Sequence, residues 1–135
     1  MTGDDAIDVA LRDVGRIAVV GASASAHRPS HEVMGMLLRA GQDVVPVNPN
    51  VREVHGIPAV ARLADVPGHI DVVDVFRRAE HAPALARDAV AVGARVLWLQ
   101  SGVVSAAARA IAEEAGLVYV EDACLGVEIR RATRR

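Results

Sequence analysis

A glycine and a run of small residues follow the first strongly apolar segment of the chain, and this pattern suits phosphate binding. Residues 17–20 are apolar and mostly β-branched, which is typical of a strand buried on both faces. Gly21 then turns the chain, small residues continue to Ala26, and Ser30 is the expected N-cap of the helix that follows. Free N–H groups and the positive end of a helix then face one spot, so we expect a phosphate-bearing ligand there.

Short polar or small-residue segments also follow the other apolar runs of the chain. If these runs are parallel strands, their carboxyl ends meet at one rim of the sheet, and the residues that follow them lie together. Such a gathering is typical of a site for a nucleotide-type ligand. The segments are Gly21-Ala22-Ser23, Asn48-Pro49, Phe76-Arg77-Arg78, Gln100-Ser101-Gly102 and Asp122 to Cys124.

Arg77 and Arg78 are the candidate cations for a phosphate ligand. All 15 basic residues are arginine, whose guanidinium offers forked donors to phosphate oxygens. Adjacent side chains of a strand point to opposite faces, so we expect only one of the two to contact the ligand. The alternatives are a solvated pair, or ion pairs with Asp74 or Glu80.

The remaining polar candidates each have a functional and a structural interpretation. Ser23 and Ser30 can donate hydroxyls to a phosphate, or serve a turn and a helix cap. Asn48 can bind a ribose or an adenine edge, or form an Asx turn before Pro49. The backbone N–H groups of the segment 100–102 form a further candidate anion site at the entrance of the next helix.

The glycine loop does not carry the pattern of an NAD site. The dinucleotide fingerprint has three spaced glycines and an acidic residue after the second strand, which binds the ribose hydroxyls. Here Gly21 is the single glycine of the loop, and the second strand ends in Val47-Asn48-Pro49. The sequence therefore disfavours NAD.

No set of residues has the spacing of a catalytic or metal site. His27 and His31 are four residues apart, but Pro29 between them argues against a continuous helix there. The Gly-x-Ser-x-Gly pattern of a serine nucleophile is also missing. Cys124, the single cysteine, is a buried structural thiol in one interpretation and a nucleophile in the other. We assign no catalytic residue and no metal ligand.

Apolar runs alternate with amphipathic segments along the whole chain, and glycines follow several of the expected helices. The alternation predicts an α/β fold, a Rossmann-like doubly wound sheet of five mainly parallel strands with helices on both faces. The stretch 46–50 contains two prolines and is expected to leave the sheet, and 59–65 to form one or two helical turns. The expected strands are 16–20, 43–47, 70–76, 95–99 and 117–120, and the expected helices are 1–14, 30–40, 80–92, 104–115 and 124–131.

Length and composition limit the class of protein. The chain has 135 residues, which suits one domain over 1–135, with 1–14 as a leading helix or arm. Aromatic residues make up only 2%, so we expect a core of Val, Leu, Ile and Ala. Trp98 lies in the middle of an expected strand, where a core residue is favoured over a platform for the ligand. The net charge of −2 argues against a general nucleic-acid binder. No apolar run is long enough to cross a bilayer and no signal peptide is apparent, so we expect a cytoplasmic protein without membrane contact.

Five segments between about residues 16 and 128 carry a resemblance to a known family. They are Ile17-Ala-Val-Val-Gly-Ala-Ser, Val45-Pro-Val-Asn-Pro, Asp71-Val-Val-Asp-Val-Phe-Arg-Arg, Val96-Leu-Trp-Leu-Gln-Ser-Gly and Glu121-Asp-Ala-Cys. In this order, they resemble the small stand-alone CoA-binding proteins, which are similar to the CoA-binding domain of the succinyl-CoA synthetase α subunit.

The resemblance implies a Rossmann-like CoA-binding fold, usually with no assigned reaction. It implies a glycine loop on the phosphates, and Asn-Pro and Phe-Arg-Arg segments along the nucleotide portion. It gives no role to His31. The ligand-binding residues that it implies are Gly21, Ala22, Ser23, Arg28, Ser30, Asn48, Pro49, Val75, Phe76, Arg77, Arg78, Gln100 and Gly102.

We therefore expect a protein that binds coenzyme A or an acyl-CoA and catalyses no reaction of its own. The alternative is a small enzyme with a nucleotide cofactor, an oxidoreductase or an acyl-transfer protein that uses Cys124. The chain can also act as a homodimer, or as a subunit that docks on a larger enzyme.

Overall fold

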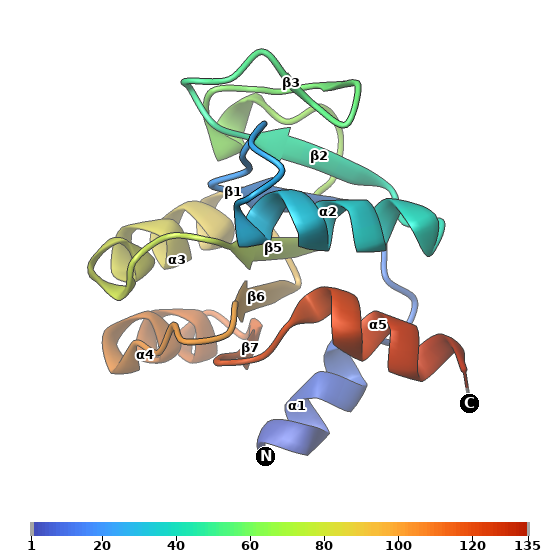
Figure 1. Ribbon diagram of the computed structural model, residues 1–135. Coiled ribbons are helices and arrows are strands. Elements are labelled where there is room, and N and C mark those ends of the chain that lie inside the picture. Colours follow the sequence, from blue (N-terminus) through green and yellow to red (C-terminus); the bar gives the residue numbers. More distant parts are fainter. Residues whose placement is uncertain (1, 135) are drawn as a thin grey trace.

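The five expected strands form one parallel sheet. In the computed structural model, which describes residues 2–134, the strand order is β2-β1-β5-β6-β7 (Figure 1). The order reverses between β1 and β5, which confirms the doubly wound, Rossmann-like α/β fold, and every strand pair is parallel. The strands are β1 (Ile17–Val20), β2 (Val44–Val47), β5 (Val72–Val75), β6 (Val96–Leu99) and β7 (Val118–Val120).

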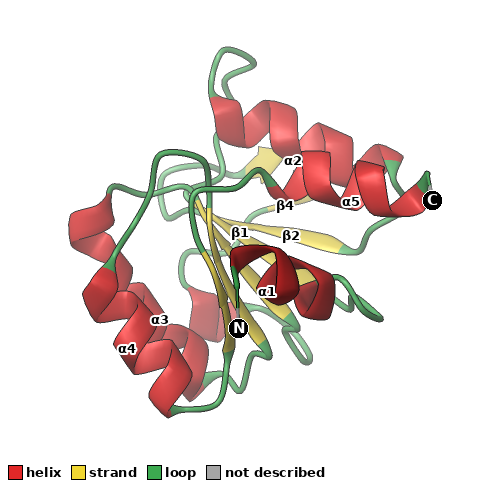
Figure 2. Cartoon of the chain, turned by 90° about the horizontal axis from the view of Figure 1, so that it is seen from below, coloured by secondary structure: helices red, strands yellow, loops and turns green. Residues whose placement is uncertain are grey.

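Helices cover both faces of this sheet, as Figure 2 shows. One face carries α1 (Gly3–Ala10), α2 (Pro29–Arg39) and α5 (Leu125–Thr133), and the other carries α3 (Ala82–Ala91) and α4 (Ala106–Glu114). None of the helices within residues 2–134 has the length and apolarity that a membrane span requires.

Several helix ends differ from the expected ones. The first helix covers Gly3–Ala10 instead of 1–14, and Met1 and Arg135 lie outside the described residues. Helix α4 begins at Ala106 because the Ser105 hydroxyl accepts a hydrogen bond from the Ala108 N–H at 3.1 Å and so caps it. Gly41 follows the end of α2 with a φ of 79°, as its expected role as a helix stop requires.

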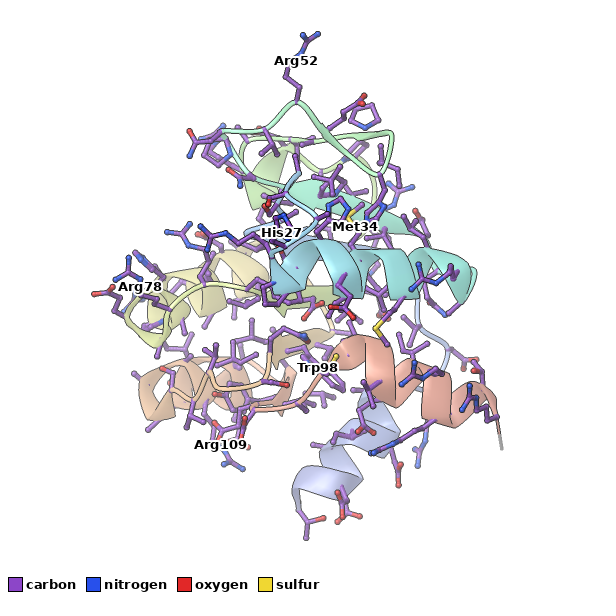
Figure 3. The ribbon with its side chains drawn as sticks, viewed as in Figure 1. His27, Met34, Arg52, Arg78, Trp98 and Arg109 are labelled. Atoms are coloured by element: carbon purple, nitrogen blue, oxygen red, sulfur yellow. The ribbon has the colours of Figure 1, made fainter. Side chains whose placement is uncertain are left out.

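The core consists of small and β-branched residues, with Trp98 as its largest side chain. Trp98 has no exposed surface and lies between the sheet and the start of α5 (Figure 3). Its indole N–H donates to the carbonyl of Ala123 at 2.9 Å, which satisfies the one polar group of the ring. Trp98 is thus a core residue, as the sequence predicted.

The connection between β2 and β5 differs from the expectation in two places. Pro46 stays in β2, in register with Val19, because β2 is an edge strand in which a missing N–H is tolerated. Residues 53–58 form a hairpin of two short strands, β3 (Glu53–Val54) and β4 (Ile57–Pro58). The sequence analysis did not identify these strands, because two residues are too few to show a period.

Two short 3-10 helices lie in the connections before and after β5. The first, η1 (Leu63–Asp65), lies within the stretch where one or two helical turns were expected. The second, η2 (Ala79–His81), leads directly into α3, so the helical region begins close to the expected residue 80.

An ion pair between Arg95 and Asp71 fastens α1 to the amino-terminal edge of the sheet. The guanidinium donates to both carboxylate oxygens of Asp71, at 2.9 and 3.0 Å, and to the carbonyls of Val9 and Ala10, at 3.1 and 2.9 Å. The Gly15 N–H also donates to Asp71, at 2.9 Å. Burial acts to raise the pKa of Asp71, but the hydrogen bonds from Arg95 and Gly15 hold it below its usual value.

Asp74 lies in the middle of β5 with no exposed surface. Its register neighbours are Val19 and Trp98, and neither carboxylate oxygen has a hydrogen-bond partner among the described residues. Burial therefore raises the pKa of Asp74 well above its usual range and favours the protonated form. The position also excludes the considered ion pair between Asp74 and either Arg77 or Arg78.

Replacing Asp74 by Asn removes this titration and keeps the size of the side chain. The pKa of Asp74 in the folded state lies above its value of about 4 in the unfolded state. The free energy of unfolding of the parent is therefore highest below about pH 4, and it falls as the pH rises from there through the folded-state pKa. Relative to Asp74→Asn, the parent should lose at most about 1.4 kcal/mol of unfolding free energy per pH unit. Urea denaturation at a series of pH values measures this difference, and two parallel curves would contradict it.

Candidate functional site

The carboxyl ends of all five strands of the sheet contribute to one cavity of about 710 Å³, which we call the rim cleft. It gathers ten of the thirteen residues that the resemblance implies, which confirms that the strand ends converge. The lining residues are Gly21, Ser23, Arg28, Pro29, Ser30, Val33, Asn48, Phe76, Arg77, Arg78, Ala79, Gln100, Ser101, Gly102, Val103 and Cys124.

A second cavity of about 570 Å³, which we call the side pocket, lies next to the rim cleft on the α3 side of the sheet. The two cavities share Gly21, Asn48, Phe76 and Arg77. Asp88 of α3 lines the side pocket, whereas none of the described residues that line the rim cleft is acidic. The two neighbouring cavities therefore differ in charge, and the rim cleft is the one that suits an anion.

Gly21 allows the chain after β1 to pass close to the end of β5. Its φ is 86°, and a Cβ atom at this position would lie 2.5 Å from the Phe76 carbonyl oxygen and 3.1 Å from Cδ of Arg77. A backbone atom cannot move aside as a flexible side chain can, so the position requires glycine for its conformation and for its space. The glycine thus shapes the wall that the two cavities share.

Two side chains hold successive carbonyls of the glycine loop. Asn48 Nδ2 donates to the Ala22 carbonyl at 2.8 Å, and Nδ1 of His31 lies 2.9 Å from the Ser23 carbonyl oxygen. Asn48 Oδ1 accepts from the Asn50 N–H at 2.8 Å, so the considered Asx turn is present. The sequence analysis gave no role to His31, because its contact depends on how the loop folds back over α2.

The start of α2 differs from the expectation. Arg28 occupies the N-cap position and Pro29 the first helical position, where its lack of an N–H does no harm. Ser30 is therefore the second helical residue and is buried, and its side chain has no hydrogen-bond partner among the described residues. The Ser30 N–H has no partner among the described residues, which leaves a donor at the helix start. The Ser23 hydroxyl accepts from the Ser25 N–H at 3.1 Å, which is the turn interpretation of that residue.

Arg77 and Arg78 both line the rim cleft, although strand alternation predicted opposite faces. Strand alternation does not govern this pair, because β5 ends at Val75 and the alternation of side chains ends with the strand. That only one of the two arginines contacts the ligand stays a prediction. Arg78 is 88% exposed, points away from the body of the molecule (Figure 3) and lies 3.8 Å from Glu80. Arg77 has no ion pair among the described residues and lies at the boundary of the two cavities.

The turn after β6 offers fewer free donors than the sequence suggested. The Gly102 N–H donates to the carboxylate of Asp122 at 2.7 Å, so it is already occupied. Gln100 is buried, and its Oε1 accepts from the Leu125 N–H at 2.9 Å at the start of α5. Helix α4 begins only at Ala106, so its N-terminus does not add to this turn.

Three of the implied ligand-binding residues do not line the rim cleft. Ala22 and Val75 have no exposed surface and form the layer behind it. Pro49 lines the side pocket instead.

Cys124 lines the rim cleft and is half-buried at the N-cap of α5. Within residues 2–134, no histidine forms a hydrogen bond with its thiol, and no group of three or more potential ligands is placed to hold a metal ion.

A family model, a curated relative and solved structures match most of the chain. A family model described as a CoA binding domain matches residues 15–130. An uncharacterized protein of Bacillus subtilis, YneT, is 40% identical over 112 residues, which is 83% of either chain. A solved structure of a hypothetical protein from Pyrococcus horikoshii is 37% identical, with a TM-score of 0.89 over 97% of this chain and 92% of that one. A structure from Thermus thermophilus is 34% identical, with a TM-score of 0.87 over 97% and 98%.

The close approach at Gly21 predicts a large loss of stability in Gly21→Ala. Gly116→Ala is the matched control, because Gly116 has a φ of 82° and open space where a Cβ would lie. The control should lose about 1–2 kcal/mol of unfolding free energy from backbone strain alone. Gly21→Ala should lose that amount and the cost of the overlap with the Phe76 carbonyl. Chemical denaturation compares the two variants, and equal losses would contradict the steric argument.

Proposed function

The chain belongs to the family of CoA-binding domains, and we propose that it binds coenzyme A in the rim cleft through the phosphates, without catalysing a reaction alone. The match over residues 15–130 supports coenzyme A as the ligand. Arg28, Ser30 and Arg77 would hold the phosphates, and the apolar surfaces of Val33 and Phe76 would pack against uncharged parts of the ligand.

The charge of the rim cleft is the observation that carries this proposal. Arg28, Arg77 and Arg78 line a cavity whose described lining residues include no acidic one, and of the three only Arg78 forms an ion pair within residues 2–134, with Glu80 at 3.8 Å. Coenzyme A carries a pyrophosphate and a ribose 3′-phosphate, so it needs more positive charge than one helix start supplies. The free Ser30 N–H adds a backbone donor beside these cations. The residues present fit the ligand.

Ligand choice tests the proposal directly. Titration calorimetry of the parent protein should show binding of CoA and negligible heat with NAD or NADP, because the loop has one glycine and Asn48 replaces the acidic residue. Tight NAD binding in the absence of CoA binding would overturn it.

The two adjacent arginines should contribute unequally. Arg77→Ala should lose roughly 1.5–3 kcal/mol of CoA binding, the size of a hydrogen bond to a charged group. Arg78→Ala should lose less, because its side chain is 88% exposed and has Glu80 nearby. Arg62→Ala is the matched control, since Arg62 lines only the side pocket and already pairs with Asp65 at 3.3 Å.

Dephospho-CoA locates the phosphate that Arg77 holds. The loss in Arg77→Ala should shrink with dephospho-CoA if Arg77 binds the 3′-phosphate, and persist if it binds the pyrophosphate. If Arg77→Ala and Arg78→Ala both bind CoA like the parent, the charge must come from Arg28 and the first loop.

Acyl transfer through Cys124 is the second candidate, and the observation that favours it is the place of Cys124 in the rim cleft. We nevertheless expect no sustained turnover by the protein alone, because no described histidine is hydrogen-bonded to the thiol as a general base. Incubation with acetyl- and succinyl-CoA, followed by assay of free thiol, tests this. If the parent turns over an acyl-CoA and Cys124→Ser abolishes the turnover, acyl transfer becomes the favoured function. A homodimer and a larger enzyme partner stay predictions.

A further inference from the structure

Two histidines connect the glycine loop to the β3–β4 hairpin. His31 lies in the first turn of α2, and His55 lies at the tip of the hairpin. Nδ1 of His31 is 2.9 Å from the Ser23 carbonyl oxygen, and Nε2 of His55 is 2.7 Å from the His31 carbonyl oxygen. Because a carbonyl only accepts, Nδ1 of His31 and Nε2 of His55 must each carry a proton and donate it. The two rings are 4.0 Å apart between centroids, at an angle of 32°. We call this pair the histidine clamp.

The clamp fixes the direction of a backbone donor as well as that of a carbonyl. A trans peptide is planar, so the C=O of one residue and the N–H of the next point in opposite directions. By holding the Ser23 carbonyl, His31 sets the direction of the Ala24 N–H, just as Asn48, by holding the Ala22 carbonyl, sets that of the Ser23 N–H. Neither of these two N–H groups has a partner among the described residues.

The turn of the β3–β4 hairpin places the ring of His55 beside His31. His55 and Gly56 both have positive φ, 51° and 77°, as a two-residue turn of type I′ requires. Asn and Asp are preferred over His at the first of these positions, so the turn itself does not explain the imidazole.

Helix α2 leaves room for the same ring. Gly35 lies inside α2, where glycine is less favourable than alanine. A Cβ at Gly35 would lie 3.2 Å from Cε1 of His55 and 3.2 Å from Nη1 of Arg39. A glycine on the helix and a histidine on the hairpin therefore fit one another.

We propose that His31 is the positioning residue of the phosphate-binding loop and that His55 holds His31 in place, so that the β3–β4 hairpin sets the affinity of the rim cleft. The proposal rests on the proposed function for its ligand. His31 touches the loop from behind and does not line the rim cleft, so it acts through the loop backbone. The hairpin thereby becomes a part of the binding site without touching the ligand.

Three variants separate the contacts of the clamp. His31→Phe keeps a ring beside His55 and removes the donor, whereas His31→Asn removes the ring and keeps an N–H donor on Cγ, where Nδ1 of histidine is attached. His55→Asn suits the turn and removes the ring. We expect His31→Phe to bind CoA roughly tenfold more weakly than the parent, since one hydrogen bond that orders the site is lost. His31→Asn should stay within about threefold of the parent, and His55→Asn should fall between the two.

Hydrogen exchange of the ligand-free protein gives a readout that does not depend on CoA. The Ser25 N–H donates to the Ser23 hydroxyl and the Arg28 N–H to the Ser25 carbonyl, both at 3.1 Å. These two amides should exchange faster in His31→Phe than in the parent and should regain their protection in His31→Asn. Thermal melting checks that each variant is folded.

The outcomes are distinguishable. If the parent binds CoA and His31→Phe matches it in both affinity and amide exchange, the proposal is overturned. If His31→Asn is as weak as His31→Phe, the donor is not the relevant contact and the proposal is also overturned. If the parent itself binds no CoA, the proposed function fails, and the exchange of the Ser25 and Arg28 amides alone decides whether the clamp orders the loop.

Discussion

Strands β1 and β5 pair in parallel, so the segments that follow them leave the sheet side by side. At Gly21 these two segments are so close that only the hydrogen of a glycine fits between them. A Cβ at Gly21 would overlap the Phe76 carbonyl, at 2.5 Å. This contact lies at the point where the strand order reverses, which is where doubly wound sheets form their ligand crevice. The same approach places Arg77 at the boundary between the rim cleft and the side pocket. The site thus follows from the way the sheet is paired.

Some polar groups at the rim form internal hydrogen bonds, and others face the rim cleft. Asn48, Asp122 and the Oε1 atom of Gln100 are all occupied by backbone groups of the loops and of α5. A buried backbone group without a partner is unfavourable, so these side chains are needed for loop structure first. Arg28 and Arg77 are exposed, line the rim cleft and have no ion pair among the described residues. The internal hydrogen bonds thereby fix the shape of the cleft, and the arginines give it its sign.

The two rims of the sheet, at the amino-terminal and the carboxyl-terminal ends of its strands, differ in how their polar groups are used. At the amino-terminal edge, Arg95 satisfies the last carbonyls of α1 and both oxygens of Asp71, so that edge is closed by internal contacts. At the carboxyl edge, the Ser30 N–H and the Arg77 guanidinium have no partner among the described residues. Between them, Asp74 introduces a buried carboxyl without a partner among the described residues, in a sheet that is otherwise apolar on that face. Burial raises the pKa of this carboxyl, so we expect the stability of the sheet to depend on pH.

Local chemistry was enough to determine the alternation of strands and helices, the core position of Trp98 and the convergence of the strand ends. Each depends on side-chain polarity repeated over several residues, together with the rule that parallel strands end on the same side. The hairpin at 53–58 was missed because its strands are too short to show a period. The N-cap was placed two residues late because Pro29 takes the first helical position and leaves the cap to Arg28.

The roles of single side chains were decided only by the tertiary structure. Asn48 had two possible interpretations in the sequence, and the fold assigns it to the Ala22 carbonyl and to an Asx turn. His31 had none, because its partners, Ser23 and His55, are 8 and 24 residues away along the chain. The sequence by itself determined that phosphate-binding residue types meet at one rim. Which of them face the cleft and which hold the loops depends on hydrogen bonds between distant segments, and no local pattern encodes the direction of those bonds.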